Sequence, residues 1–380
     1  MTTNQTIHAD LIASTTNPCG LTAAVQISPH VIAEPGYVVA VRAMEEKDTY
    51  NEVECHDGTL RTIQAGQVLV GVLGERHALK GYSGHVPASV AVGDTLHVLN
   101  LGGILGRCTS AVPALGESLR VEVLGAVMTQ HGARTAHARI QDGALPPADS
   151  LPASAPLVVV SGTAMDTGKT AAASALVEGL AAAGHTVAAA KLTGASLMRD
   201  VQTMKASGAA EVATFTDAGV VCSTQGDIVP VAKGIIQHLN DSNPDVIVLE
   251  LGDGIVGDYG VDDLLADQEI QKHAAAHVVT ATDLAGAWAA HTLFRDLFQA
   301  KITVMTGPVT DNAVGSRYIE TKFAIPAANA IQQSEKLVDT VMKNMPSPVT
   351  QQGEASSVPA SDSTALSVPD VHGVPITGSA

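Results

Sequence analysis

Aromatic residues are scarce in this sequence, although hydrophobic residues are plentiful. They make up 3% of the 380 residues, whereas hydrophobic residues as a whole make up 46%. The core must therefore be built mainly from Ala, Val, Leu and Ile, as is typical where helices pack closely on a buried parallel sheet. A chain of this length favours two domains over one.

Paired cysteines and long apolar runs are also missing. The four cysteines lie far apart, at Cys19, Cys55, Cys108 and Cys222, and include no Cys-x-x-Cys pair that would indicate zinc or a disulfide framework. The N-terminal residues lack the basic flank and apolar core of a signal peptide, and no apolar run reaches the ~18 residues of a membrane span. We therefore expect a reduced, cytoplasmic protein without a membrane partner.

Basic charge is in short supply as well. The chain has 21 Lys and Arg against 38 Asp and Glu, a formal net charge of −17. A nucleic acid needs a basic surface, so none is expected as a partner. A small anionic molecule is compatible with this charge, because backbone N–H groups and a single lysine can build a local phosphate site.

The first part of the chain is predicted to be rich in β-strands. We expect a flexible N-terminus over 1–20 and a small β-barrel or sandwich domain over 21–130, in which Gly-rich turns separate short apolar runs. The predicted strands are Tyr37–Arg42, Gln67–Leu73, Thr95–Leu99 and Ser118–Val127. Residues 131–156, rich in Ala, Pro and Asp, are predicted to be a linker.

Residues 157–340 alternate between apolar strands and helices. This pattern predicts an α/β domain with a doubly wound, mostly parallel sheet covered on both faces. A helix is expected from Lys169 to Ala183. The expected strands are Leu157–Ser161, Thr186–Lys191, Gly219–Ser223, Asp245–Leu251, His277–Thr280 and Ile302–Thr306. Residues 346–380 are mostly small or polar and are predicted to be a disordered tail.

One motif carries specific chemistry. The segment LVVVSGTAMDTGKT contains the P-loop pattern G-x-x-x-x-G-K-T, with an apolar strand before it and an Ala-rich helix after it. In such a loop, backbone N–H groups surround phosphate oxygens, Lys169 reaches the β- and γ-phosphates, and the Thr170 hydroxyl coordinates Mg²⁺. The N-terminus of the helix adds a positive field at the same place. The sequence therefore predicts binding of a nucleoside triphosphate with Mg²⁺.

Two charged residues end apolar strands where a parallel sheet binds its ligand. Lys191 would place a cation beside the phosphates, or be a solvated lysine at a strand end. Glu250 follows four apolar residues and would bind the metal or its water, or be a paired structural acid. Three acids, Asp166, Asp200 and Asp217, could hold Mg²⁺ or a substrate amine, or be surface acids or helix caps.

These segments resemble the dethiobiotin synthetase-like branch of P-loop enzymes, which includes cobyrinate synthases and accessory proteins of molybdopterin maturation. The family loop G-T-D-T-x-V-G-K-T appears here as GTAMDTGKT, its second-strand K-P-V-x-S-G begins at Lys191, and its fourth-strand E-G-A-G-G begins at Glu250. The resemblance covers about 157–320. It departs at three positions on the substrate side, Leu192, Leu251 and Asp253, so the diamine of biotin synthesis is not the expected substrate.

The resemblance implies a set of site residues. Lys169, Lys191 and Glu250 would be catalytic, with Lys191 between the γ-phosphate and a carboxylate or carbamate, and Asn312 would read the base. It also implies a homodimer or higher homo-oligomer. The implied metal residues are Thr170 and Glu250, and Asp200 is added as a metal candidate from its position after Lys191. The implied nucleotide-binding residues are Gly162, Thr163, Asp166, Thr167, Gly168, Lys169, Thr170, Ala171 and Asn312.

Two weaker patterns lie elsewhere. The segment GERHALKGYSGH is either a solvated loop or a wall of the substrate site facing the P-loop. Five of its polar side chains are candidates for binding an anionic substrate: Arg76, His77, Lys80, Tyr82 and His85. Residues Asn100–Gly103 are either a second such loop or a hairpin turn. His273 and His277 have helical metal-ligand spacing, but no Glu follows the first, and a metal is not expected there.

Two functions are compatible with these patterns. The first is an ATP- and Mg²⁺-dependent enzyme of the ligase or synthetase type that activates a small carboxylate or amine substrate by phosphoryl transfer. The second is a GTP-binding accessory protein of cofactor maturation or another nucleotide-switch protein. No Asn-Lys-x-Asp segment, by which GTPases usually read guanine, is found, which favours ATP. A nucleotide-binding regulator without turnover is a third, weaker alternative.

Overall fold

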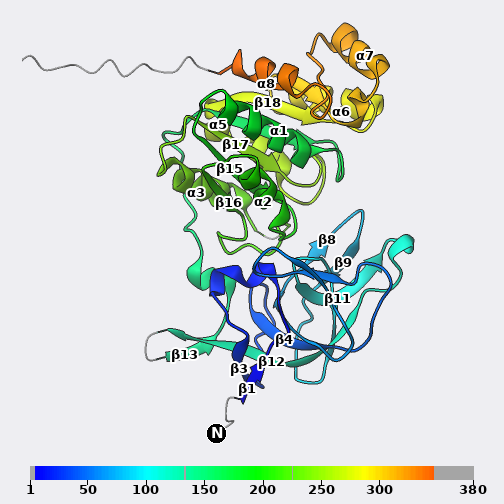
Figure 1. Ribbon diagram of the computed structural model, residues 1–380, viewed down its shortest axis with the longest axis vertical. Helices are drawn as coiled ribbons and strands as arrows, with labels where there is room; N and C mark the ends of the chain where they lie inside the picture. The colour runs from blue at the N-terminus through cyan, green and yellow to red at the C-terminus, as the bar shows by residue number, and fades with distance from the viewer. Residues whose placement is uncertain (1–4, 132–133, 225, 346–380) are drawn as a thin grey trace, which may run out of the picture. The chain divides into compact units, whose positions relative to one another are not determined.

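The computed structural model describes residues 5–131, 134–224 and 226–345. The disordered tail predicted for 346–380 lies outside these residues. A β-rich region and an α/β region follow one another along the chain, and both belong to one compact unit (Figure 1). None of the helices within the described residues is both long and apolar enough to span a membrane.

Strands of the β-rich region close into a small barrel. Strand β12 pairs with β4, β4 with β7, β7 with β11, β11 with β10, and β10 again with β12. The bounds of these strands are β4 (Val38–Ala43), β7 (Val68–Leu73), β10 (Thr95–Val98), β11 (Ile104–Ala111) and β12 (Arg120–His131). Because this pairing returns to its first strand, the sheet is closed and these strands leave no open edge. Of the two predicted alternatives, barrel and sandwich, the barrel is the observed one.

Strand β4 of the barrel is buried on both faces over most of its length, with only Arg42 exposed. Val39 and Val41 lie in one apolar cluster, together with Leu69 and Leu105 from neighbouring strands. The alternate residues of the same strand belong to a second cluster on the other face. Successive side chains of a strand point to opposite faces, so two cores can share one strand.

Further strands extend the barrel. They are β1 (Gln5–His8), β2 (Leu11–Ile12), β3 (Ala24–Ser28), β8 (Arg76–His77), β9 (Tyr82–His85) and β13 (Arg134–His137), with β5 (Glu52–Glu54) and β6 (Leu60–Thr62) forming a separate hairpin. The prediction of a flexible N-terminus is wrong for residues 5–20. Strand β1 pairs with β3, β2 pairs with β7, and Leu11 is buried against the barrel core.

The predicted linker is also partly structured. Residues 134–137 form β13 and pair with β12, and a short 3-10 helix, η3 (Ile140–Gly143), follows. Ala138, Ile140 and Leu151 are buried. The Ala- and Pro-rich composition therefore did not predict the strand pairing and buried side chains of this segment. An extended chain without regular structure begins only after Gly143.

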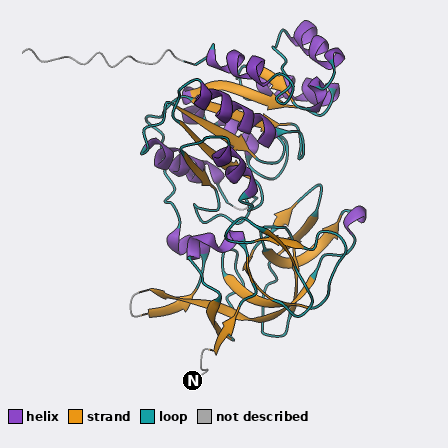
Figure 2. Cartoon of the chain, in the orientation of Figure 1, coloured by secondary structure: helices purple, strands orange, loops and turns teal. Residues whose placement is uncertain are grey.

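The α/β region contains a six-stranded sheet in the order β16-β15-β17-β14-β18-β19, and all five strand pairs are parallel. This confirms the predicted α/β fold class (Figure 2). The strands are β14 (Leu157–Gly162), β15 (Val187–Thr193), β16 (Glu211–Thr214), β17 (Val246–Leu251), β18 (Ala274–Thr280) and β19 (Val304–Thr306).

Helices cover both faces of this sheet. On one face, α1 (Lys169–Ala182), α2 (Arg199–Ala206) and α8 (Ser334–Met342) share an apolar core with the strands. The other core includes the remaining helices, α3 (Ile228–Asn240), α4 (Val261–Ala266), α5 (Gln268–His273), α6 (Leu284–Asp296) and α7 (Ala313–Phe323). Figure 1 shows the sheet between these layers. Double coverage explains why the strands are continuous apolar runs.

One strand prediction is wrong. Residues Gly219–Ser223 form turns and bends, with only an isolated bridge between Cys222 and Ala195. The edge strand is instead β16, Glu211–Thr214, which pairs with β15. It is short and partly exposed, so it lacks the apolar run of the inner strands, whereas the apolar 219–223 segment is buried as a loop.

Candidate functional site

The P-loop joins β14 to α1 at the carboxyl edge of the sheet. Gly168 has a φ of +88°, which an L side chain adopts only under strain, and it places Lys169 at the first position of α1. The Thr167 hydroxyl lies 2.6 Å from that of Thr280 at the end of β18 and fixes the loop to the neighbouring strand. The Lys169 ammonium donates a hydrogen bond of 2.7 Å to the Ala164 carbonyl across the loop.

Lys169 is a buried cation held without an ion pair among the described residues. It is 6% exposed. Burial lowers the pKa of Lys169 to about 8, although the negative charges of Glu250 and Asp253 oppose this shift. A phosphate at this position would restore a close negative charge. The loop is therefore arranged to bind an anion.

Lys191 and Glu250 lie side by side next to the P-loop. The register pairs Lys191 on β15 with Glu250 on β17, and Glu250 with Val160 on β14, the P-loop strand. The Thr170 hydroxyl donates a 2.9 Å hydrogen bond to Glu250 Oε1. The strand-end placement that the apolar pattern predicted is thus observed, with both charged side chains buried.

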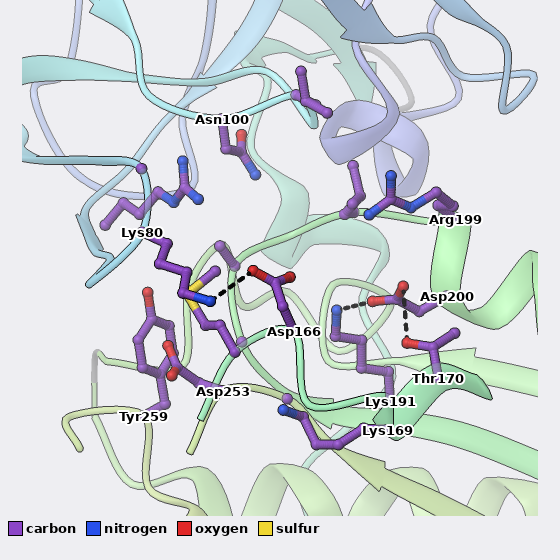
Figure 3. Close-up of a pocket in the computed structure, with 18 of the residues that line it drawn as sticks. Lys80, Asn100, Asp166, Lys169, Thr170, Lys191, Arg199, Asp200, Asp253 and Tyr259 are labelled. Atoms are coloured by element: carbon purple, nitrogen blue, oxygen red, sulfur yellow. Dashed lines mark hydrogen bonds and ion pairs between the residues drawn. The ribbon is translucent and has the colours of Figure 1, made fainter. Parts of the chain in front are cut away.

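A second acid completes this charge network. Asp200 on α2 accepts a hydrogen bond from the Lys191 ammonium, and its other oxygen lies 3.4 Å from the Thr170 hydroxyl. Burial opposes both charges, but the ion pair prevails: the pKa of Lys191 is raised and that of Asp200 is lowered. Figure 3 shows Lys191, Asp200 and Thr170 in this chain of contacts.

Glu250 carries the feature that best fits a metal ion. Burial raises the pKa of Glu250, and its buried Oε2 atom has no hydrogen-bond partner among the residues that the structure describes. A carboxylate oxygen of this kind, beside the Thr170 hydroxyl, supplies the hard ligands that Mg²⁺ prefers. Mg²⁺ in P-loop sites takes few protein ligands and several from phosphates and water, so these residues fit the ion.

The P-loop and the strand ends border a cavity of about 890 Å³. Of the predicted nucleotide-binding residues, Asp166, Gly168, Lys169, Thr170 and Ala171 line it, as do Lys191, Asp200 and Glu250. Gly162, Thr163 and Thr167 are not among its lining residues; Thr163 donates its backbone N–H to the Thr280 carbonyl. Most of the predicted site thus converges on one space (Figure 3).

Two predicted residues lie elsewhere. Asn312 caps α7 by accepting a hydrogen bond from the Val314 backbone N–H and is not part of the cavity wall. Asp217 accepts a hydrogen bond from the Thr214 backbone N–H and lines a separate, smaller pocket of about 280 Å³. Asp217 is therefore not brought to the P-loop, because the turn after β16 carries it away from the strand ends.

The β-rich region forms the opposite wall of the cavity. Arg76, Lys80 and Asn100 all line it. Lys80 lies 3.3 Å from Asp166 of the P-loop, and Asn100 donates a 2.7 Å hydrogen bond to the Ser196 carbonyl. Arg76 and Lys80 thus belong to the cavity wall. Asn100 does too, but residues 100–103 are also the hairpin turn between β10 and β11, so both interpretations of that segment hold.

The other members of the GERHALKGYSGH segment have different surroundings. Tyr82 is fully buried, and its hydroxyl donates to the Leu115 carbonyl at 3.1 Å. His77 lies 3.5 Å from Asp258, and both side chains are largely exposed. His85 is exposed at the end of β9. None of the three lines the cavity.

The cavity also includes residues that sequence analysis missed. Arg199 precedes Asp200 at the start of α2, and Tyr50 and Tyr259 come from loops of the two regions. Arg199 could have been found from its position beside a predicted site acid. The two tyrosines stand in no motif, and only tertiary packing brings them here.

The histidine pair does not form a metal site. His273 ends α5, whereas His277 lies within β18 and contacts the Gln271 side chain at 2.9 Å. Within residues 5–131, 134–224 and 226–345, no group of three or more His, Cys, Asp or Glu is arranged to hold a metal ion.

Comparisons with known proteins give little beyond this geometry. No family model and no curated protein matches the chain. Among solved structures, cell division protein FtsY from Thermotoga maritima has 16% identity and a TM-score of 0.34 over 51% of this chain and 71% of its own. The signal recognition particle 54 kDa protein from Aeropyrum pernix, in complex with GDP, has 14% identity and a TM-score of 0.34 over 54% and 52%.

A DUF1611 family protein from Anabaena variabilis is similar to the same extent. It has 13% identity and a TM-score of 0.36, covering 50% of this chain and 58% of its own. At TM-scores this low, none of these similarities carries an argument about family or activity. The assignment of the P-loop as a nucleotide site therefore depends on the sequence motif and on the geometry described above.

Proposed function

We propose that this protein is an ATP- and Mg²⁺-dependent enzyme that activates a small carboxylate by phosphoryl transfer. The observation that carries the proposal is the shared cavity. One wall is a P-loop with a buried lysine and a metal-compatible Thr170–Glu250 pair, and the opposite wall carries cations from a separate region of the chain. This arrangement has room for a second, anionic reactant beside a triphosphate.

The nucleotide side of the reaction would rest on the P-loop residues. Lys169 would exchange its hydrogen bond to the Ala164 carbonyl for one to a β- or γ-phosphate oxygen. The backbone N–H groups at the start of α1 would hold the remaining oxygens. Thr170 and Glu250 would hold Mg²⁺, which supplies charge neutralisation at the phosphates when bound.

In the proposed step, a carboxylate oxygen of the substrate attacks the γ-phosphorus. The new bond is the P–O bond of an acyl phosphate, and the bond between the γ-phosphorus and the bridging oxygen breaks, so that ADP leaves with the electron pair. Lys191 would lie between the two anionic reactants and offset their repulsion. Such a transfer needs positioning and charge stabilisation rather than covalent chemistry from the protein.

The test is to trap the product. Purified protein is incubated with Mg²⁺-ATP, a panel of small carboxylates and hydroxylamine, which converts acyl phosphates to hydroxamates. We expect one class of carboxylate to accelerate phosphate release by at least about tenfold and to yield the hydroxamate. In Lys191→Met this acceleration should be lost while nucleotide affinity changes by less than about threefold, because Lys191 acts on the transition state.

Other outcomes would contradict the proposal. Turnover that no carboxylate accelerates, with no hydroxamate formed, would exclude carboxylate activation. A preference for GTP together with such turnover would favour the nucleotide-switch protein. Equal loss of affinity and rate in Lys191→Met would remove the role proposed for Lys191.

A further inference from the structure

Arg76 is a buried cation at the end of the cavity that faces the P-loop. It begins β8 of the β-rich region and is 6% exposed. Its Nη1 atom donates to the Leu99 carbonyl and to the Tyr50 hydroxyl, the latter at 3.0 Å. Both acceptors are neutral, so these bonds orient the guanidinium without neutralising its charge.

The guanidinium of Arg76 lacks a counter-ion. No carboxylate in the described part of the chain forms an ion pair with it, and its Nε atom is buried without a hydrogen-bond partner. Burying a permanent charge unpaired is costly, and so is burying an unsatisfied N–H group. An anion in the cavity would offset the first of these costs, the unpaired charge.

The surrounding wall favours such an anion. Among its described residues, the β-rich region contributes two cations to the cavity wall, Arg76 and Lys80, and no acid. All its lining residues are Tyr50, Arg76, Lys80, Gly81, Asn100, Leu101, Val112, Ala114 and Leu115. Gly81 leaves room for the guanidinium, since a methyl group there would lie 2.7 Å from Nη2.

The acids that line the cavity come from the other wall. Asp166 is engaged by Lys80, and Asp200 by Lys191, while Glu250 accepts from Thr170. Asp253 is the remaining acid, and burial raises its pKa, against the opposing effect of Lys169 and Arg76. Figure 3 shows Asp253 beside Tyr259, on the wall that carries Lys169. Asp253 therefore interacts electrostatically with Arg76, but none of these acids lies within ion-pair distance of its guanidinium.

We propose that Arg76 binds a second oxyanionic group of the substrate, remote from the carboxylate that is phosphorylated. The substrate class is then a small molecule with at least two anionic groups, either a dicarboxylate or a carboxylate that also bears a phosphate-like group. This assignment rests on the proposed function. Arg76 would act as a specificity-determining residue, because its Nη2 atom has no hydrogen-bond partner among the described residues and a guanidinium forms strong charge-assisted hydrogen bonds to oxyanions.

The test is calorimetric, on the full chain saturated with Mg²⁺ and a non-hydrolysable ATP analogue. The probes are the linear dicarboxylates from succinate to pimelate and the monocarboxylates of equal carbon number. A third set, the phosphonocarboxylates of matching length, distinguishes a carboxylate from a phosphate-like group. We expect one chain length in the dicarboxylate or phosphonocarboxylate set to bind at least about tenfold more tightly than its monocarboxylate.

Two variants of Arg76 and one control test whether Arg76 causes the preference for the doubly charged probe. Arg76→Gln should abolish this preference. Arg76→Lys, which keeps the charge and fills the space, should retain a smaller preference. Arg107→Gln is the matched control, since Arg107 is an exposed arginine on β11 that does not line the cavity. It should bind every probe as the wild type does. All variants should bind the nucleotide analogue with unchanged affinity, which also reports that they fold.

Failure of this assignment is distinguishable from failure of the proposed function. The assignment would be overturned if both Arg76→Gln and Arg76→Lys still bound the doubly charged probe more tightly than the monocarboxylate, to the same extent as the wild type. It would also be overturned if the wild-type protein bound the nucleotide analogue but bound singly and doubly charged probes with equal affinity, or bound neither kind of probe. Failure of the proposed function would instead appear as absent nucleotide binding or absent hydroxamate.

Discussion

The two walls of the cavity hold their charges in different ways. At the P-loop wall, Lys191 pairs with Asp200, Glu250 accepts from Thr170, and Lys169 donates to a carbonyl of its own loop. At the opposite wall, Arg76 donates to two neutral acceptors, and no carboxylate of the described residues forms an ion pair with it. Among the described residues, each wall thus contains a buried cation without an ion pair, Lys169 or Arg76, but only the P-loop wall also contains a buried ion pair, Lys191–Asp200.

This difference separates two tasks. A network of paired charges keeps its geometry without a ligand, and pre-organised charges stabilise a transition state without reorganisation cost. An unpaired buried cation stabilises little by itself, but it discriminates strongly between ligands that supply an anion and those that do not. We therefore infer that the P-loop wall serves catalysis and the β-rich wall serves substrate selection.

The largest effect is expected from removing the P-loop lysine. Lys169→Ala should weaken Mg²⁺-nucleotide binding by at least about 100-fold, the size expected when charge-assisted hydrogen bonds to phosphate are lost. The fold should persist, because Lys169 has no ion pair among the described residues to leave unpaired. Calorimetry measures the affinity and circular dichroism the fold. Affinity equal to that of the wild type would refute the P-loop assignment.

Replacing the metal-compatible acid should affect turnover more than folding. Glu250→Gln keeps an acceptor for the Thr170 hydroxyl but removes the charge beside it, so turnover should fall by about 100-fold and lose most of its Mg²⁺ dependence. The matched control is Glu54→Gln, a buried glutamate that accepts from the Met198 N–H and lies outside the cavity wall. Similar kinetic losses in both variants would show that burial, not the metal site, is responsible.

A smaller effect is expected from pH. Burial lowers the pKa of Lys169 to about 8, and a bound triphosphate should raise it, so binding takes up a proton above that pH. Affinity for the nucleotide should therefore be constant below about pH 7 and fall above pH 8, by at most about tenfold per pH unit. Calorimetry in buffers of different ionisation enthalpy measures the proton uptake. A flat profile up to pH 10 would contradict the lowered pKa.

The smallest effect is expected from the exposed contact between the walls. Lys80 and Asp166 form an ion pair in which the side chains are 62% and 72% exposed, so solvent screens it. Lys80→Ala should change the free energy of unfolding by less than about 1 kcal/mol. Chemical denaturation measures this change. A change above about 2 kcal/mol would mean that the contact is not screened.

Site residues were predictable from the sequence where a local motif or strand pattern fixes their position, and not where tertiary packing alone does. The P-loop, Lys191 and Glu250 were found because the motif and the continuous apolar strands place them at one edge of the sheet. Arg76 and Asn100 were flagged only as members of polar loops, because nothing local tells which wall a loop will form. Tyr50 and Tyr259 could not be found, since their place depends on how the two regions pack.

The fold was predictable to a similar degree. Strands β14 and β17 are buried on both faces of the sheet and are therefore continuous apolar runs, so the sequence predicts them. The edge strand β16 and the N-terminal strand β1 lacked such runs because each is partly exposed. Backbone hydrogen bonds to neighbouring strands stabilise β16 and β1, and a pattern of apolar residues does not predict such bonds.

The central claim is that the P-loop wall binds a nucleotide with Mg²⁺. The most direct measurement is a calorimetric titration of the purified full chain with ATP and with GTP, each with and without Mg²⁺. We predict one site per chain, Mg²⁺-dependent binding of ATP, weaker binding of GTP, and loss of both in Lys169→Ala. Binding of neither nucleotide, or binding that Lys169→Ala leaves intact, would contradict the account.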